Sequence, residues 1–392
     1  MNDGVEGGWS VAGDGGGVTV SSSLTQMAEL MNQLGTDMAS ATAAIRQITT
    51  RSRMLALNAR IEAARAGGAI GAAFDVVASE MSELAGRTAE VAGNLKTESE
   101  QLTQRILGRL STLNTHLETI VKGEQLATAA LTTVDLIDRN LYERSCDCRW
   151  WATDAAAVDV LTAVTENRPS DQVRQAVGHA NMRLGVILDA YTVYYDIVLA
   201  DTRGRLIARG RPDQFPLDGV DVSQSRWFQA GMSTPSGNDF GFHSMHSSPL
   251  VNGREVLIYS AAVREGGQRN GRPLGVLGVI FNWRTFAEKI VTQMARSDDG
   301  SQRRVVVVEG SGRVLADSIT SVWDGRFDFA GMSDMLVRDR NYGVASIAGT
   351  RSVVGHAQSP GFETYRTGWH AFAISPMVEI DFQFGGMSSQ AA

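Results

Sequence analysis

Apolar residues recur at alternating steps of three and four along the first part of the chain. The series reads Leu24, Met27, Met31, Leu34, Met38, Ala41, Ile45 and Ile48, and it continues through Ser52, Leu55 and Ala59. This is the heptad period of a coiled coil, in which an apolar stripe on one helix packs against another helix. Residues 1–23 are rich in glycine and serine and lack this period, which indicates a disordered tail.

Glycines interrupt the helical pattern after Ala66. Gly67 and Gly68 predict the end of the first helix, because glycine readily adopts the left-handed conformation that closes helices. The heptad series then resumes at Val77, Met81, Leu84, Thr88, Val91 and Leu95. A turn at residues 68–71 therefore predicts an antiparallel helical hairpin over residues 24–125. On the return arm, extra four-residue steps predict a one-residue register slip near Gly108.

Beyond about Leu117 the apolar seam has no partner left in its own chain. We therefore expect a connector helix over residues 126–181 that associates with a second copy as a parallel coil. The alternative is that this helix packs back on the C-terminal domain.

Residues 182–376 show the short β-branched and aromatic runs that are typical of strands. The strands are expected at residues 191–199, 205–208, 255–262, 275–283, 304–309, 313–316, 344–348, 352–358 and 369–374, with a helix at 285–295. The strand, turn, strand pattern occurs twice, which predicts two antiparallel sheets. The fold class is α+β, and residues 377–392 are expected to form a flexible tail.

Composition excludes several classes of function. The net charge of −7 and the lack of a long basic run argue against nucleic acid or an anionic membrane as a partner. Cys146 and Cys148 are expected to be reduced thiols of a cytoplasmic protein. They would supply only two ligands, which is too few for a metal site. There is neither a signal peptide nor an apolar run of 18 residues, so we expect no membrane span. Catalytic and phosphate-binding motifs are also absent, so neither an enzyme nor a cofactor is expected.

The stretch Met54-Leu-Ala-Leu-Asn-Ala-Arg-Ile-Glu-Ala-Ala-Arg-Ala-Gly67, followed by Phe74-Asp-Val-Val-Ala78, resembles the hairpin tip of methyl-accepting chemotaxis proteins. The resemblance implies a homodimer, or a trimer of dimers, that contacts a CheW-like coupling protein and a CheA-like histidine kinase. The implied contact residues before the turn are Met54, Leu57, Asn58, Glu62 and Arg65. Those after the turn are Phe74, Val76 and Val77.

The tip departs from the family pattern in its charged residues. Arg51-Ser52-Arg53 replaces the usual Gln-Thr-Asn, and Arg60 stands where alanine is usual. Such changes mostly alter partner choice, so the partner is a divergent kinase or kinase coupling is lost. In the family, adaptation depends on methylation of paired Glu or Gln residues. The sequence around Glu124 and Gln125 is the one near match to such a site, so we expect little or no methylation.

The long helix followed by two sheet modules resembles a double Cache sensor domain with PAS-like sheets. The residues around Trp227 and the closing Gly368-Trp369 carry this resemblance, which implies a small-molecule ligand. Ser225 stands where amino-acid sensors of the family have an arginine, so an amino-acid ligand is not expected. The pocket candidates are Tyr194, Arg226, Trp227, His243, His246 and Tyr259.

Each pocket candidate has a simpler alternative. Tyr194 and Trp227 suit an apolar core equally well. His243 and His246 have the spacing of metal ligands, but without a third ligand we expect histidines of a polar loop or pocket. The sequence thus predicts a soluble chemoreceptor-like transducer. The alternatives are a scaffold with a degenerate sensor and an enzyme on the C-terminal modules, which would require a reactive constellation of residues.

Overall fold

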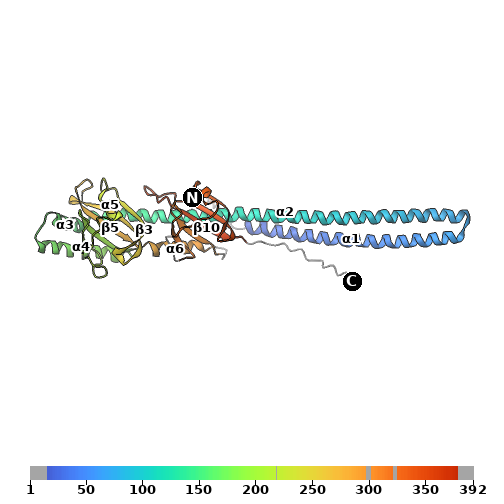
Figure 1. Cartoon of the computed structure of the whole chain (residues 1–392), viewed down its shortest axis with the longest axis horizontal. Helices are drawn as coiled ribbons and strands as arrows, with labels where there is room; N and C mark the ends of the chain where they lie inside the picture. The colour runs from blue at the N-terminus through green and yellow to red at the C-terminus, as the bar shows by residue number, and fades with distance from the viewer. Residues whose placement is uncertain (1–15, 218, 297–301, 321–324, 378–392) are drawn as a thin grey trace, which may run out of the picture. The chain divides into compact units, whose positions relative to one another are not determined.

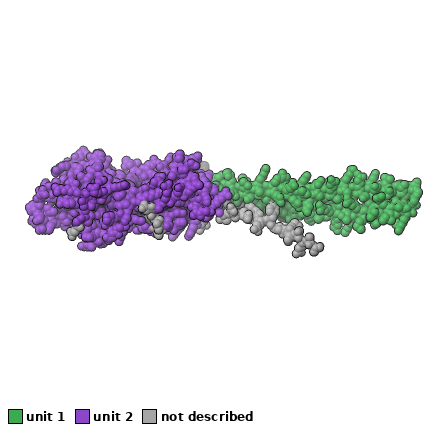
Figure 2. Space-filling view, viewed as in Figure 1, with its two compact units in different colours: residues 1–121, 378–392 green, residues 122–377 purple. Residues whose placement is uncertain are grey.

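A computed structural model describes residues 16–217, 219–296, 302–320 and 325–377. The chain divides into two compact units, residues 1–121 with 378–392 and residues 122–377, which are coloured separately in Figure 2. The first unit holds α1 (Gly16–Ala66) and the first part of α2 (Gly68–Trp151). The second unit holds the rest of α2 and all of the strands. The predicted α+β class, a helical hairpin followed by two antiparallel sheets, is confirmed.

The first unit is an antiparallel pair of long helices joined at Gly67 (Figure 1). Gly67 and Gly68 have φ angles of 59° and 66°, the left-handed region that glycine tolerates. Gly71 already lies inside α2, so the turn is shorter than the predicted 68–71. A Cβ atom on Gly71 would lie 2.5 Å from the carbonyl oxygen of Ala63, so only glycine fits there. α1 begins at Gly16, earlier than the predicted Leu24, and the rest of the expected tail lies outside the described residues.

The two arms meet along a seam of small residues. On α1 the seam consists of the buried Leu24, Ala28, Thr42, Thr49 and Ala56 and the half-buried Met31, Gly35, Met38, Ile45 and Ser52. The facing residues of α2 include the buried Ala78, Ala85 and Ala92. Across the pair, Arg60 Nε lies 3.0 Å from Asp75 Oδ1. Small side chains allow close approach of the arms, and the seam is therefore narrower than a leucine-rich coiled coil.

The predicted seam is wrong in register at about half of its positions on α1 and at all of its positions on α2. Met27, Leu34, Ile48 and Leu55 on α1 are exposed, as are Val77, Met81, Leu84, Val91 and Leu95 on α2. They form a second stripe of large apolar side chains that the single chain leaves uncovered, here called the apolar stripe. The predicted slip near Gly108 is confirmed, because the buried positions advance by fifteen residues from Ala92 to Leu107, one more than two heptads.

In the second unit, α2 continues to Trp151 and is followed by α3 (Ala155–Thr165) and α4 (Ser170–Ala190). The connector is therefore three helices, and the last ends nine residues beyond the predicted residue 181. Asp154 caps the N-terminus of α3, because its Oδ1 accepts a hydrogen bond from Ala156 N at 2.9 Å. α3 and α4 pack on the first sheet and on each other.

The first sheet has the order β2-β1-β5-β4-β3 and is antiparallel throughout. Its strands are β1 (Tyr194–Asp201), β2 (Leu206–Arg209), β3 (Gly241–Ser248), β4 (Arg254–Arg264) and β5 (Pro273–Phe281). The face opposite α3 and α4 carries the short helix α5 (Arg226–Met232). Single turns of 3₁₀ helix, η1 (Pro249–Val251) and η2 (Glu265–Gly267), precede and follow β4. Strand β3 was not predicted, because it is rich in polar residues and lacks the run of β-branched and aromatic residues that indicates a strand.

The second sheet repeats this order as β7-β6-β10-β9-β8. α6 (Trp283–Ala295) leads into β6 (Arg304–Val308) and β7 (Val314–Asp317), and α7 (Met332–Leu336) precedes β8 (Arg340–Ile347), β9 (Thr350–Gln358) and β10 (His370–Pro376). β8 begins at Arg340, four residues before its predicted start. One apolar core runs through both sheets and the helices that pack on them.

Within the second unit, α2 is held closely against the second sheet. Gly355 of β9 touches it, since a Cβ atom there would lie 2.2 Å from Ala127 N. Asp138 is fully buried and accepts hydrogen bonds from Ser359 Oγ at 2.5 Å and Thr367 Oγ1 at 2.7 Å. A buried carboxylate with such partners fixes the position of its helix, because breaking the contacts would leave the charge unsatisfied.

Candidate functional site

The residues predicted for the hairpin tip lie on the surface of the first unit. Met54, Leu57, Phe74, Val76 and Val77 are each 57–62% exposed. Exposure of several large apolar side chains at one turn is unusual for a surface without a partner.

The charged and polar residues of the tip are also exposed. Asn58 is exposed, and Glu62 pairs with Arg65 on its own helix, with Oε1 and Nη1 2.8 Å apart. The unusual Arg60 is accounted for by its contact with Asp75 on the other arm. Sequence reasoning did not single out Asp75.

The near match to a methylation site lies in the second unit rather than on the hairpin. Glu124 Oε2 is 2.8 Å from Arg340 Nη2 of β8, whereas Gln125 is exposed. The carboxylate at this position therefore holds α2 to the second sheet.

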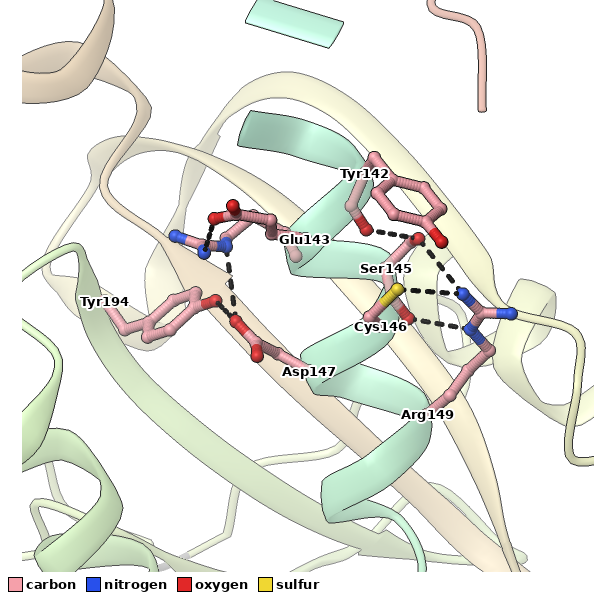
Figure 3. Close-up of polar contacts among 8 residues, drawn as sticks. Tyr142, Glu143, Ser145, Cys146, Asp147, Arg149 and Tyr194 are labelled. Atoms are coloured by element: carbon pink, nitrogen blue, oxygen red, sulfur yellow. Dashed lines mark hydrogen bonds and ion pairs between the residues drawn. The ribbon is translucent and has the colours of Figure 1, made fainter. Parts of the chain in front are cut away.

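The six pocket candidates do not line one pocket. Tyr194 and Tyr259 belong to the core on the side of the first sheet that faces α3 and α4. Tyr194 donates a hydrogen bond to Asp147 Oδ2 at 2.5 Å, and Arg144 Nε lies 3.2 Å from the same oxygen (Figure 3). Burial raises the pKa of the Tyr194 hydroxyl, with the carboxylate of Asp147 adding to the effect.

Tyr259 forms the next contact toward the second sheet. Its hydroxyl lies 2.6 Å from the hydroxyl of Tyr365, and both rings contact Phe240. Burial raises the pKa of the Tyr259 hydroxyl, so both phenols stay neutral. The two predicted tyrosines thus make separate buried polar contacts, Tyr194 with α2 and Tyr259 with the loop before β10.

Trp227 lies in a separate core on the other face of the first sheet. Its ring covers Gly278, where a Cβ atom would lie only 2.7 Å away. On the same face the fully buried Arg209 bonds to the fully buried Asp196, with Nε and Oδ2 2.7 Å apart. Arg209 also stacks on Phe215. This face is filled by the side chains of the chain itself.

His243 and His246 lie on strand β3, so the predicted loop is wrong. Their rings stack with centroids 3.6 Å apart across an irregularity in the strand. Burial, together with the smaller effects of His246, Arg226 and Arg313, lowers the pKa of His243 to about 4. Arg226 therefore lies near enough to His243 to affect its pKa. No third histidine, cysteine, aspartate or glutamate completes a metal-binding group with them in the described part of the chain.

A cavity of about 170 Å³ lies where the end of α2 meets β4. Its lining includes Arg149, Arg264 and Arg269, which sequence reasoning did not single out. Arg149 also donates to Cys146 Sγ at 3.3 Å (Figure 3). Arg149 is far in sequence from Arg264 and Arg269, and the three belong to no motif, so their convergence could not be found from spacing.

Among the described residues, no helix is long and apolar enough to cross a membrane.

Comparison with known proteins gives the N-terminal region a family. Residues 8–146 match the methyl-accepting chemotaxis protein (MCP) signalling domain. The chain is 32% identical over 157 residues to the frizzy aggregation protein FrzCD of Myxococcus xanthus, which covers 40% of this chain and 34% of FrzCD. The chain thus spans about a third of the length of that relative.

Two solved sensory domains resemble the C-terminal region. The ligand-binding domain of the Pseudomonas fluorescens chemoreceptor CtaA, in complex with L-leucine, matches 65% of this chain and 94% of its own at 15% identity and a TM-score of 0.44. The sensory domain of the Campylobacter jejuni chemoreceptor Tlp3 matches 65% and 94% at 12% identity and a TM-score of 0.48. The N-terminal region is thus similar to a chemoreceptor signalling domain, and the family match is confined to residues 8–146.

Proposed function

We propose that this protein is a chemoreceptor-like signal transducer. A small molecule binds the unit formed by residues 122–377, and the hairpin passes the resulting change to a histidine kinase complex of the CheA and CheW type. We place the protein in the cytoplasm, where such kinases act. The protein performs no catalysis of its own in this scheme.

One observation carries the proposal. α2 is a single helix from Gly68 at the hairpin turn to Trp151 beside the first sheet. Asp138 and Glu124 hold its second half to the second sheet. A ligand that changes the packing of this half therefore acts on the same helix that forms the return arm of the hairpin. The size of the response is limited by the ligand's preference between the two packings.

The apolar stripe supports a homodimer. It runs along both arms of the hairpin and leaves large side chains such as Leu84, 65% exposed, without a covering partner in the described chain. A second hairpin that covers the stripe would complete a four-helix bundle with its large residues inside. Trimers of such dimers would form through Met54, Leu57, Asn58, Glu62 and Arg65.

Capture of a CheW-type coupling protein from the same organism tests the kinase contact. We expect the full chain to bind it and Phe74→Glu to lose binding, because a charge would enter the apolar centre of the contact. Gln47→Glu is the matched control, since it adds the same charge at an exposed position of the same hairpin and should bind normally. The proposed kinase contact would be rejected if the unmodified chain failed to bind the coupling protein and Glu62→Ala and Arg65→Ala made no difference.

A second candidate is a scaffold that assembles through the hairpin and has a degenerate sensor. The packed core around Trp227 and the buried Asp196–Arg209 pair favour it, since these side chains pack against and neutralise one another without a ligand. Coupling-protein capture without any small-molecule effect on the melting temperature would support the scaffold.

A further inference from the structure

The cavity beside the end of α2 has walls from four parts of the second unit. Arg149, Ala152 and Thr153 come from α2 and the residues after it, and Gly237 and Asn238 from the loop before β3. Ala261, Ala262 and Arg264 belong to β4, and residues 267–269 to the loop that follows. At about 30 Å³ per water molecule, its volume of about 170 Å³ corresponds to roughly six waters. It suits an inorganic ion or a short acid rather than a drug-sized ligand.

Backbone contacts hold these walls together. Gly237 N donates to Arg269 O at 2.8 Å, which ties the two loops to each other. Gly267 has a φ of 65° and sits against Thr153, where a Cβ atom would lie 3.3 Å from the carbonyl oxygen. The cavity is therefore formed before any ligand enters.

The lining carries three guanidinium groups and no carboxylate. None of Arg149, Arg264 and Arg269 forms an ion pair within the part of the chain that the structure describes. Arg149 Nη1 donates to Asn238 O at 2.9 Å, and Arg264 donates to Gly271 O at 3.0 Å. Carbonyl oxygens thus orient both side chains without neutralising them.

Arg264 is the most informative of the three. It is only 6% exposed, and its Nε is buried without a hydrogen-bond partner among the described residues. Arg209, which is also buried, shows the usual arrangement, because Asp196 neutralises it at 2.7 Å. A buried charge without a counter-charge is costly, and an anion in the cavity would remove that cost.

We propose that this cavity binds a small oxyanion, a carboxylate or a phosphate, between Arg149, Arg264 and Arg269. Guanidinium groups suit such ligands because their planar donors match two oxygens at once. The side-chain amide of Gln268 in the lining provides a further hydrogen-bond donor. The site lies on neither the Trp227 face nor the histidine pair, and none of the predicted pocket candidates lines it.

The bound anion would connect α2 to the loop between β4 and β5. Arg149 is in the last turn of α2, whereas Arg264 and Arg269 are in β4 and the following loop. An anion held by all three tightens the end of the helix against the first sheet. The binding claim depends on the cavity alone, and the consequence for signalling rests on the proposed function.

Calorimetric titration of the full chain tests the site. The probes are sodium phosphate and sodium succinate at constant ionic strength, with succinamide as the neutral analogue of succinate. We expect one of the two anions to bind saturably and succinamide not to bind. Arg269→Gln should weaken binding about tenfold, the effect of losing one charge-assisted hydrogen bond. Arg269 is exposed and without a side-chain partner among the described residues, so the unliganded variant should melt like the unmodified chain.

Arg272→Gln is the matched control. It removes the same charge from the same loop, but Arg272 does not line the cavity and lies 3.7 Å from Glu265. Binding within twofold of the unmodified chain is expected. The proposal is overturned if neither anion binds, if succinamide binds equally, or if both variants weaken binding to the same extent. Phosphate binding without succinate binding assigns the phosphate class, and the reverse assigns the carboxylate class.

A kinase assay separates this inference from the proposed function. If the anion binds saturably but leaves the activity of a reconstituted CheA-type kinase unchanged, the anion site is supported. The proposed transfer of the signal from the site to the kinase is then rejected. Loss of coupling-protein capture in Phe74→Glu with unchanged anion affinity would show that the site and the tip act separately.

Discussion

At the scale of single residues, the second sheet contains a buried pair of histidines. His356 Nε2 lies 2.9 Å from His370 Nδ1, and His356 Nδ1 lies 3.2 Å from Asn341 Oδ1. An amide oxygen only accepts, so His356 donates from Nδ1 and accepts at Nε2 from His370. Burial lowers the pKa of His356 to about 4, with a further contribution from His370. Both rings are therefore neutral in the folded protein at neutral pH.

The histidine pair predicts a loss of stability in mild acid. Between about pH 6.5 and pH 4 the unfolded chain binds a proton at residue 356 that the folded chain does not, so stability falls as pH falls through this window. The effect by pH 4.5 is on the order of 3 kcal/mol, because a pKa lowered from 6.5 to about 4 changes stability by about 1.4 kcal/mol per pH unit within this window. Melting temperatures of the full chain from pH 7.5 to pH 4.5 measure it.

His356→Gln should flatten this pH dependence. His243, whose pKa is also lowered to about 4, contributes in the same window and should leave a residual slope. His116→Gln is the control, because His116 is exposed on α2. A melting curve whose pH dependence is the same in His356→Gln as in the unmodified chain would contradict the assignment.

At the scale of the elements, the hairpin depends on which heptad position carries the small residues. Ala56 is fully buried between the arms, whereas its neighbour Leu55 is 62% exposed. The heptad spacing of large residues predicted the helices correctly but placed the contact one residue away. The most deeply buried contacts between the arms are made by alanine and threonine, and the large residues of the apolar stripe face outward.

Enlarging the seam should destabilise the hairpin. Ala56→Leu adds a bulky group at a site without free space, which typically costs about 1–3 kcal/mol. Ala43→Leu makes the same change at an exposed position and should cost less than about 0.5 kcal/mol. Thermal unfolding of the full chain by circular dichroism at 222 nm compares them. Equal melting temperatures for the two variants would show that the arms do not meet at Ala56.

At the scale of the whole molecule, the apolar stripe predicts association of two chains. Leu84→Glu places a charge in the expected contact, and each copy loses about 1.5–3 kcal/mol of apolar burial. Because a symmetric dimer contains the change twice, its dissociation constant should rise at least roughly tenfold.

Sedimentation equilibrium of the full chain measures this change. Asn94→Glu, an equal charge change at another exposed position of α2, should leave the constant within about twofold. An unmodified chain that stays monomeric at every concentration would contradict the dimer.

Periodicity and turn chemistry made much of the fold predictable. The two long helices, the glycine turn, the slip near Gly108 and nine of the ten strands follow from local patterns. β3 was missed because His243, Ser244 and His246 are polar, and its strand conformation depends on pairing with β4. α4 extends to Ala190 because contacts with α3 and the first sheet support its last turns.

The sequence by itself determined the class of this protein, because heptads, strand runs and the tip motif are local properties of the chain. The tertiary structure decided which heptad face the arms share and which polar groups meet. Tyr194 and Tyr259 made separate buried polar contacts, Trp227 joined a core, and Arg149, Arg264 and Arg269 converged on one cavity. Such convergence depends on distances across the fold, which residue spacing along the chain does not encode.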